Sequence, residues 1–382
     1  MRLPRPRGPV TAALFARLAT APPAEPWADG GGGLLVDGSA PAPGRLADGS
    51  APAPSELGDG DLQLALFACY ELHYQGFDGV DPRWEWEPSL LALRAVLERR
   101  FERALARAVP RPPAVPPGEV RAALAAMTAP GAGPSTAAFL RRHADLAQFR
   151  EFVAHRSVYH LKEADPHTWA IPRLRGGPKA ALVEIQSDEY GGGRTERMHA
   201  ELFRATMRGL GLDDSYGAYL DRVPGITLAV SNVMSLFGLH RRLRGAAAGH
   251  LAALEMTSSL PNRHYAEGLR RLGGDATTAR FFDEHVQADA VHEQIAAHDL
   301  CAGLAAQDPA LAGDILYGAA CALEVERLWA EHVLGCWRRG TSSLEPPGAD
   351  GSRPDAAEAR PRTARAQSAG TAGPESAVAS TA

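Results

Sequence analysis

The sequence predicts an all-α protein, and two observations support this fold class. Leucines and aromatic residues recur at helical spacing, for example over residues 61–77 and 88–109. Valine, isoleucine and threonine are sparse, and the alternation of apolar and polar residues that is typical of strands does not occur. The 382 residues are 45% apolar, which is enough for one large domain or two modest ones.

Composition restricts the class of function. The formal net charge is −5 and the arginines are scattered, so the chain lacks the basic footprint of a nucleic-acid-binding protein. Its four cysteines form no CxxC pair, which favours a reducing, cytoplasmic setting. No apolar run approaches the roughly 20 residues of a membrane span. A short apolar stretch near the N-terminus contains Arg17, so we expect a short first helix there and no secretory signal.

Three parts are expected along the chain. Residues 1–60 form an N-terminal segment with a linker rich in proline, glycine and alanine, in which DGSAPAP occurs twice. Such a sequence cannot bury enough apolar area to offset its ordering entropy. Residues 61–340 form a helical domain, and residues 341–382, rich in alanine, serine, proline and glycine, form a disordered tail.

Helix breakers set the expected ends of the elements in the first half of the domain. Pro88 opens a helix, and the proline-rich connection 110–118 precedes a short helix over 119–127. A loop of glycine and proline then leads into one long helix over 136–163, which Pro166 ends.

The second half continues as helices separated by glycine and proline. A helix over 179–190 stops at Gly191–Gly193, and this triple glycine lacks the Gly-Lys-Ser/Thr and the preceding strand of a phosphate-binding loop. Further helices are expected over 194–212, over 226–260 as one or two buried helices, over 261–273 with Pro261 at its start, from Gly274 to about Leu304, and over 309–340.

The stretch 281–293 carries the clearest chemical signal. His285, Asp289 and His292 are separated by four and three residues, so on a helix they share one face, within an arc of roughly 60°. Two imidazoles and a carboxylate on one face suit iron, manganese or zinc better than magnesium or calcium, which prefer oxygen ligands. The alternative is a solvated polar face, because the stretch also carries further acidic residues.

Other residues could complete a buried metal site. A pair of irons between helices needs about four carboxylates to neutralise two divalent cations, together with two or three imidazoles. Separate predicted helices offer such a set, with the carboxylates Glu163, Glu189, Glu255 and Asp289 and the imidazoles His199, His285 and His292.

Several alternatives to this set stay open. Glu184 lies five residues before Glu189, and Glu196 precedes His199 by three residues, the Glu-x-x-His spacing of carboxylate-bridged iron proteins. Glu71 and His73 are two residues apart and face different ways on a helix, which favours structural roles.

Four segments together carry a resemblance to a known family, namely HLKEADPHTWAIPRL (160–174), VEIQSDEYGGGRTERMHAELF (183–203), LEMTSSLPNRHYAEGLRRLG (254–273) and FFDEHVQADAVHEQIA (281–296). Over residues 150–300 the chain resembles the iron-containing redox enzyme family, within the heme-oxygenase-like diiron oxidases and oxygenases. The resemblance implies a heme-oxygenase-like bundle of about seven core helices that binds two irons and no heme. It also implies catalytic positions at Glu189 and Glu255 and the metal ligands Glu163, Glu189, His199, Glu255, His285, Asp289 and His292.

The same resemblance implies a chemistry. Relatives use O2 as a co-substrate to oxidise a small organic substrate, by amine N-oxygenation or by oxidative C–C cleavage, and an external reductant is expected. Glu255 is the expected flexible carboxylate. Pocket candidates are Trp169, Tyr190, His264 and Tyr265, for which core packing is the alternative role.

Other functions remain open. They are a mononuclear metal enzyme, a heme-degrading enzyme of the same fold, and a non-catalytic metal-binding helical protein. The run HEQIAAH fails the zinc motif HExxH because Ala296 stands where the second histidine would be. The first predicted helix offers no histidine for heme, which leaves His73 as the conceivable one. The sequence does not identify the substrate or the reductant, or decide whether the chain forms a homodimer.

Overall fold

The computed structural model describes residues 1–23, 56–131, 133 and 135–347, apart from the side chains of residues 289 and 290. Every regular element in these residues is helical, so the all-α prediction is confirmed. The α-helices are α1 (Pro9–Leu18), α2 (Gly60–Glu71), α3 (Pro88–Ala108), α4 (Val120–Thr128), α5 (Thr136–Arg142), α6 (Leu146–His160), α7 (Asp165–Thr168), α8 (Gly176–Glu189), α9 (His199–Gly209), α10 (Gly225–Leu239), α11 (Arg244–Arg271), α12 (Ala276–Gln294), α13 (Gly303–Gln307) and α14 (Ala312–Arg338). A π-helix, η7 (Ile295–Ala302), joins α12 to α13, and short 3₁₀ turns connect other elements.

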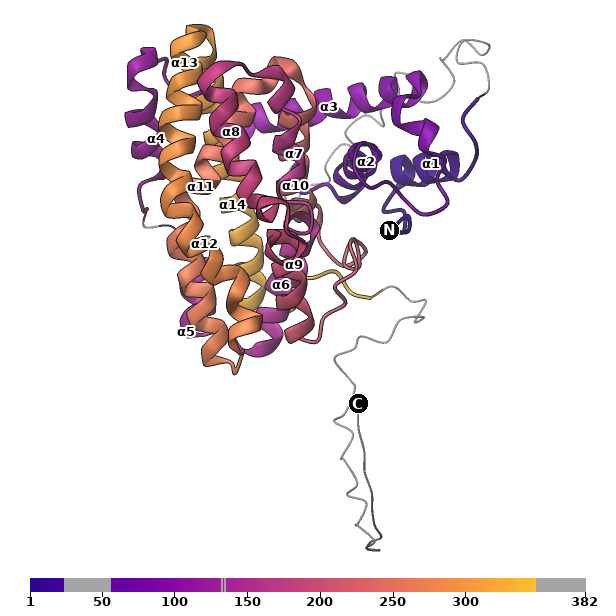
Figure 1. Cartoon of the computed structure of the whole chain (residues 1–382). Helices are drawn as coiled ribbons and strands as arrows, with labels where there is room; N and C mark the ends of the chain where they lie inside the picture. The colour runs from indigo at the N-terminus through magenta and orange to yellow at the C-terminus, as the bar shows by residue number, and fades with distance from the viewer. Residues whose placement is uncertain (24–55, 132, 134, 348–382) are drawn as a thin grey trace, which may run out of the picture.

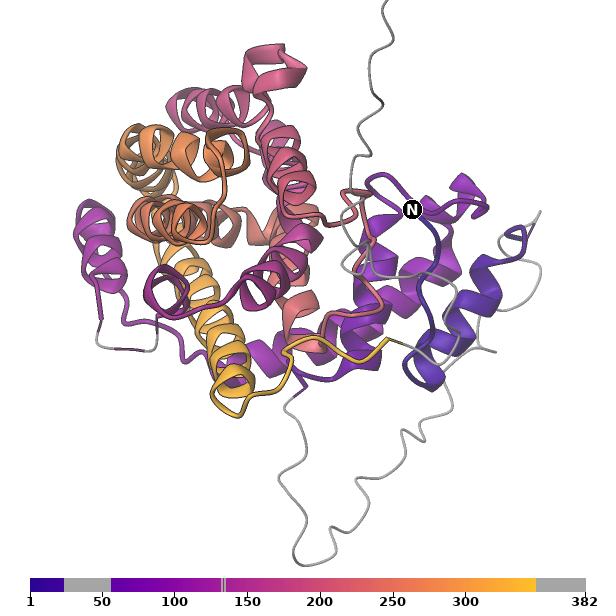
Figure 2. The same ribbon diagram turned by 90° about the horizontal axis from the view of Figure 1, so that it is seen from below.

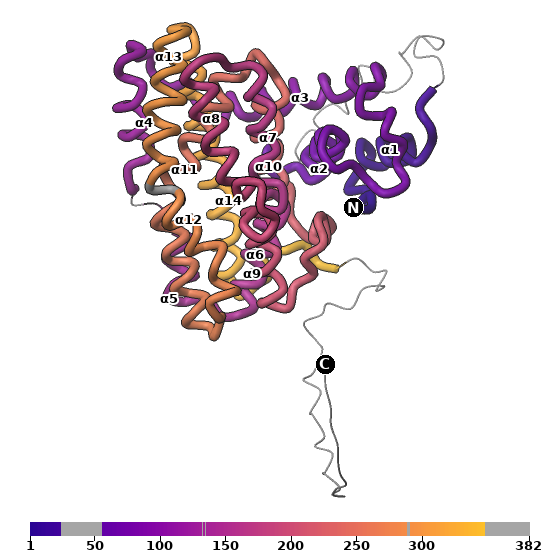
Figure 3. The backbone as a smooth tube through the Cα atoms, in the orientation of Figure 1, coloured from indigo at the N-terminus to yellow at the C-terminus, as the bar shows by residue number. Residues whose placement is uncertain are grey.

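The helices from α4 onward form a tall bundle, and α1, α2 and α3 lie to one side of it (Figure 1). Seen from below, the indigo and purple N-terminal helices again stand beside the magenta, orange and yellow bundle (Figure 2). Within the bundle α11 packs along both α12 and α14, and the tube view shows α11 and α12 side by side (Figure 3). The long helix α11 is therefore the central support of the bundle.

Small residues let α11 and α14 approach closely. A Cβ added to Gly249 of α11 would lie 1.8 Å from the carbonyl oxygen of Ile315, and a Cβ added to Gly318 of α14 would lie 2.0 Å from that of Ala246. Neither distance is compatible with van der Waals contact, so only glycine permits this backbone approach. The contact fixes the position of α11, which carries Glu255.

The prediction of one helix over 136–163 is wrong. The chain leaves α5 at His143, and α6 begins after Asp145, whose side chain accepts a hydrogen bond from the backbone N–H of Gln148 at 2.8 Å. The Oε1 of Gln148 accepts a hydrogen bond from the backbone N–H of Asp145 at 3.1 Å, which completes a capping box. This cap favours the start of a new helix, α6, over a continuation of α5.

The prediction that Pro261 opens a helix is also wrong, because Pro261 lies inside α11. Proline lacks the N–H that would bond to the carbonyl of Thr257, which usually kinks or ends a helix. Here the helix continues because the residues on both sides are held by packing against α12, α5 and α14. Tertiary contacts outweigh the local preference.

A buried ion pair attaches the N-terminal helices to the bundle. Lys162 follows α6, and its Nζ lies 2.8 Å from Glu71 Oε2 at the end of α2. The hydroxyl of Tyr216 donates to the same carboxylate oxygen at 2.7 Å. Lys162 immediately precedes Glu163, so this pair also holds the turn on which Glu163 stands.

We expect Lys162→Met to lower the free energy of unfolding by about 3 kcal/mol, because it leaves the Glu71 carboxylate buried without its cation. Urea unfolding of the metal-free protein measures this. The chain's other lysine, Lys179, is only partly buried, and Lys179→Met is the control, with an expected change within about 0.5 kcal/mol. Equal effects of the two substitutions would contradict a special role for the pair.

Two predicted segments fall largely outside the described residues. The linker within residues 1–60 lies at 24–55, and most of the predicted tail lies at 348–382. The start of the tail does pack on the bundle, because Ser343 is buried and its Oγ donates to Glu151 Oε2 at 2.7 Å. No helix among the described residues is long and apolar enough to cross a membrane.

Candidate metal centre

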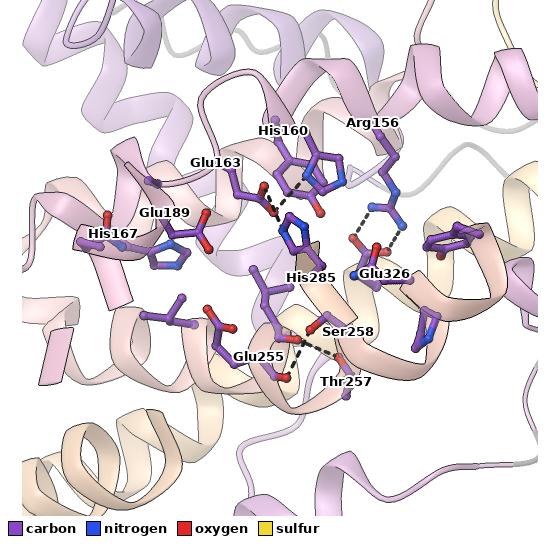
Figure 4. Close-up of a pocket in the computed structure, with 18 residues that line it drawn as sticks. Arg156, His160, Glu163, His167, Glu189, Glu255, Thr257, Ser258, His285 and Glu326 are labelled. Carbon is purple, nitrogen blue, oxygen red and sulfur yellow. Dashed lines mark hydrogen bonds and ion pairs between the residues drawn. The ribbon is translucent and has the colours of Figure 1, made fainter. Parts of the chain in front are cut away.

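Two groups of acidic and imidazole side chains meet in the middle of the bundle. The first contains Glu163, Glu189, His199 and His285, and the second contains Glu189, Glu255 and His292. Within each group one ligand atom per residue lies within 4.8 Å of every other. The groups share Glu189, so they form one continuous cluster, part of which is drawn in Figure 4.

The triple glycine explains how Glu189 and His199 meet. Glu189 ends α8 and His199 begins α9. Between them Gly191, Gly192 and Gly193 have φ of 65°, 60° and 80°, the left-handed region that glycine adopts without strain. These turns reverse the chain and place His199 Nδ1 3.0 Å from Glu189 Oε2.

His285 is held with one ring nitrogen facing the cluster. Its Nδ1 lies 2.8 Å from the carbonyl oxygen of Phe281, one turn earlier on α12, so Nδ1 carries the proton that is donated. The opposite nitrogen, Nε2, then presents a lone pair and lies 3.7 Å from Glu163 Oε2. This orientation by a backbone carbonyl is typical of imidazoles that bind metals.

His292 lies on the same face of α12, about two turns after His285. Its Nδ1 lies 3.5 Å from Glu255 Oε2, and its Nε2 lies 3.2 Å from Asp188 Oδ2. Asp188 can thus orient the ring, while Nδ1 faces the cluster. Asp289 also lies within α12, but its side chain falls outside the described residues. Its predicted role as a ligand stays a prediction.

The chemistry of these donors fits divalent metal ions. The buried atoms His199 Nδ1, Glu189 Oε2, Glu163 Oε2 and His292 Nδ1 make no hydrogen bond of acceptable geometry to any described residue. They face charged partners at 3.0, 3.5 and 3.7 Å, whereas buried polar atoms are otherwise almost always joined by well-directed hydrogen bonds. Bound cations would satisfy these lone pairs and neutralise the carboxylates.

The pKa shifts reflect the same need for cations. Burial acts to lower the pKa of His292, but the adjacent Glu255 carboxylate outweighs it and raises the pKa to about 9. Burial raises the pKa of Glu255 itself above its usual range. Burial also acts to raise the pKa of Glu163, but the His160 and His285 rings outweigh it and hold the pKa below its usual range. The pKa of His199 is also raised, by the Glu189 carboxylate against the effect of burial, so without a metal protons on His199 and His292 offset part of the carboxylate charge.

Two histidines of the site were not assigned to it from the sequence. His160 ends α6, is buried, and has its Nδ1 3.0 Å from Glu163 Oε1. The i, i+3 spacing to Glu163 is a signal that could have identified it. His167 on α7 lies with its Nε2 3.3 Å from Nδ1 of His250, and burial lowers the pKa of His167 to about 4. No spacing in the sequence links His167 to His250.

A cavity of about 270 Å³ opens beside the cluster. Glu163, Glu189, Glu255 and His285 line it, so a molecule in the cavity would contact the metal-binding side chains. The remaining lining residues are Arg156, Tyr159, His160, Ala164, His167, Gln186, Leu251, Leu254, Thr257, Ser258, Pro261, Asn262, Tyr265 and Glu326. Of the predicted pocket residues, Tyr265 alone is among them.

The alternative ligands lie elsewhere. Glu184 and Glu196 are both exposed, so neither can replace a buried ligand of the cluster. His264 lies with its Nε2 3.2 Å from a guanidinium nitrogen of Arg141. His73 pairs with Glu85, with 3.3 Å between Nδ1 and Oε1.

Two of the predicted pocket residues serve the surrounding structure. Tyr190 donates to Asp165 Oδ1 at 2.7 Å, and Trp169 packs edge-on against His73. Glu71 pairs with Lys162, as described above, so Glu71 and His73 have different partners, in agreement with their spacing.

Comparison with known proteins agrees with this geometry. Residues 150–327 match the family model described as iron-containing redox enzyme. A curated relative, the nitrosourea synthase of Streptomyces achromogenes subsp. streptozoticus, is 28% identical over 138 residues. This match covers 36% of the present chain and 29% of the relative. The segment 150–327, which contains every proposed ligand, is thus similar to the iron-containing redox enzyme family, and the resemblance predicted from the sequence is confirmed over these residues.

Proposed function

We propose that the chain is an O2-dependent, non-heme diiron oxidoreductase that oxidises a small organic substrate in the cavity beside Glu255. The observation that supports this most strongly is the pair of donor groups that share Glu189. A carboxylate that belongs to both groups can bridge two ions, as in the carboxylate-rich diiron sites of helical bundles. The family match supports the choice of iron.

The proposal assigns ligands to each side of the cluster. Glu163, His199 and His285 would hold one iron, and Glu255 and His292 would hold the other, with Glu189 between them. Asp289 is assigned to the second iron from its place in the sequence, three residues before His292. Glu163, Glu189, Glu255 and Asp289 would together cancel the formal charge of two Fe(II) ions. This neutrality matters because uncompensated charge in a protein core is strongly unfavourable.

Two bound irons would supply the activation of O2, and the chain's own side chains perform the remaining tasks. The Phe281 carbonyl and Asp188 fix the orientation of His285 and His292, respectively. Leu251 and Leu254 contribute apolar wall to the cavity, which limits water beside the reacting atoms. Glu255 lies at the border of cluster and cavity, where a carboxylate could accept a proton from the substrate.

The named relative favours one of the two expected reactions. A nitrosourea carries a nitroso group on nitrogen, so forming one requires oxidation at nitrogen. We therefore propose amine N-oxygenation ahead of oxidative C–C cleavage. The reductant is external in either case.

The test is anaerobic loading of the full chain with Fe(II), followed by O2 uptake in the presence of ascorbate. We expect about two irons per chain and O2 uptake that Zn(II)-loaded protein does not show. The Asp289→Ala variant, measured beside it, is expected to lose about one iron, because each side of the cluster would bind its own ion. An iron-to-chain ratio near one in the wild type would instead favour a mononuclear enzyme. A ratio near two without O2 uptake would favour a non-catalytic metal-binding protein.

A further inference from the structure

One side chain in the cavity wall has a polar atom without a partner. Gln186 of α8 lines the cavity and is 3% exposed, and its Nε2 is buried without a hydrogen bond to any described residue. A buried amide nitrogen of this kind is unfavourable unless a ligand or a water accepts from it. Gln186 lies three residues before Glu189, so both side chains project from the same side of α8. The unpaired amide therefore stands next to the carboxylate that the two donor groups share.

Contacts behind the cavity wall orient the Gln186 amide. The hydroxyl of Thr168 on α7 donates to Gln186 Oε1 at 2.9 Å. The Tyr190 hydroxyl lies 3.1 Å from Thr168 Oγ1 and donates to Asp165 Oδ1 at 2.7 Å. None of these three partners lines the cavity, so the amide oxygen is bound on the outer side and Nε2 is turned inward. The reverse orientation would place the amide oxygen beside the Glu189 carboxylate, where like partial charges repel.

Other polar side chains of the cavity wall are bound within the protein. Arg156 of α6 donates from Nη1 and Nη2 to Oε1 and Oε2 of Glu326 on α14, at 2.7 and 2.8 Å. Ser258 donates to the backbone carbonyl of Glu255 at 3.2 Å (Figure 4). Gln186 differs from them, because it offers an uncharged N–H donor to whatever enters the cavity.

The type of donor determines the type of ligand that it favours. An amide nitrogen donates and cannot accept, so it favours an atom with a lone pair over an ammonium or amine N–H. The hydrogen bond is stronger when the acceptor carries negative charge. The carboxylates of the cluster would repel an anion, but bound metal ions would cancel their charge and attract it. A glutamate at position 186 would instead add a further negative charge.

We propose that Gln186 Nε2 donates a hydrogen bond to the negatively charged acceptor atom of a ligand bound at the metal cluster beside Glu189. This inference rests on the proposed function, because the ions that would hold the ligand are those of the diiron site. Gln186 is then a ligand-binding residue that carries no charge and binds no metal. No covalent bond is made or broken in this step.

The test is titration of the full chain with sodium azide, a small anion with acceptor nitrogens, after loading with Fe(II) and oxidation in air. Azide bound to Fe(III) absorbs visible light, so its Kd is measured without turnover. Gln186→Leu should weaken azide binding about tenfold or more, since it removes a hydrogen bond to a charged group. It should keep about two irons per chain, because Gln186 is not a ligand.

Two further variants support the interpretation of this titration. Gln186→Met keeps the length of the side chain and should lose azide affinity like Gln186→Leu. Gln287→Leu replaces an exposed glutamine of α12 and should bind azide like the wild type. Circular dichroism checks that each variant keeps its helices.

The proposal is overturned if both Gln186 variants bind azide as tightly as the wild type, or if the wild type does not bind azide. It is also overturned if the two variants lose iron together with azide affinity. Gln186 would then support Glu189 as a metal ligand instead of binding the anion.

Iron content and O2 uptake of the same preparations separate this proposal from the diiron function. About two irons and O2 uptake, with unchanged azide affinity in the Gln186 variants, would overturn the role of Gln186 and leave the diiron function standing. A loss of azide affinity of about tenfold in a protein that binds iron but takes up no O2 would do the opposite.

Discussion

The His285→Ala variant is expected to hold at most about one iron per chain where the wild type holds about two. His285 supplies a nitrogen that is already oriented to the cluster, because its Nδ1 is bound to the Phe281 carbonyl. Its ring also lies 4.4 Å from that of His199, centre to centre, so both imidazoles face the same ion site. Removing a direct ligand should weaken iron binding at this site by at least about 100-fold, the upper end of what loss of a supporting residue costs. Iron analysis after anaerobic loading and desalting measures the effect.

A histidine of the same helical run provides the control for this variant. His298 lies on η7, and its side chain is 63% exposed. The His298→Ala variant should therefore load like the wild type. Circular dichroism of both metal-free variants checks that the helices are retained. If His285→Ala binds as much iron per chain as the wild type, His285 is not a metal ligand, and the first donor group is not an iron site.

The local part of the site was predictable from the sequence. The spacing of His285 and His292 is a helical period, so both face one way whatever the rest of the chain does. Glu189 and His199 were assigned together because their segment resembles the family, and the helix end at the triple glycine was predicted. The positive φ angles that bring the two side chains together are seen in the structure. Short-range rules suffice where both partners belong to the same or consecutive elements.

Contacts between distant segments could not be predicted. Arg156 and Glu326 are 170 residues apart, and no pattern in either helix indicates that they meet. The prediction that Pro261 opens a helix is wrong for a different reason. The local preference of proline was outweighed by packing of α11 against neighbouring helices, which the sequence does not reveal. The exclusion of Glu184 likewise depends on its exposure, which is a property of the whole bundle.

The Glu255→Ala variant is expected to keep its fold and much of its iron but to lose O2 uptake by about 10–100-fold. Glu255 is buried on α11, and its Oε2 lies 3.5 Å from His292 Nδ1, at the border between cluster and cavity. The first donor group does not depend on it. In the metal-free protein burial is the main cause that raises the pKa of Glu255, and the nearby Glu189 carboxylate also raises it. Removing Glu255 therefore relieves a repulsion between carboxylates and should not unfold the chain.

Three measurements on Glu255→Ala test this separation of binding from reactivity, namely iron per chain, O2 uptake with ascorbate, and circular dichroism. Glu184→Ala is the matched control, because it removes an exposed glutamate of the same bundle and should behave like the wild type. If Glu255→Ala also behaves like the wild type, Glu255 is not the reactive carboxylate. The exposed Glu184 and Glu196 could not take its place. A carboxylate that the proposal leaves without a metal, Asp188, lies 3.2 Å from His292 Nε2, and Asp188→Ala would then be expected to show the loss of O2 uptake.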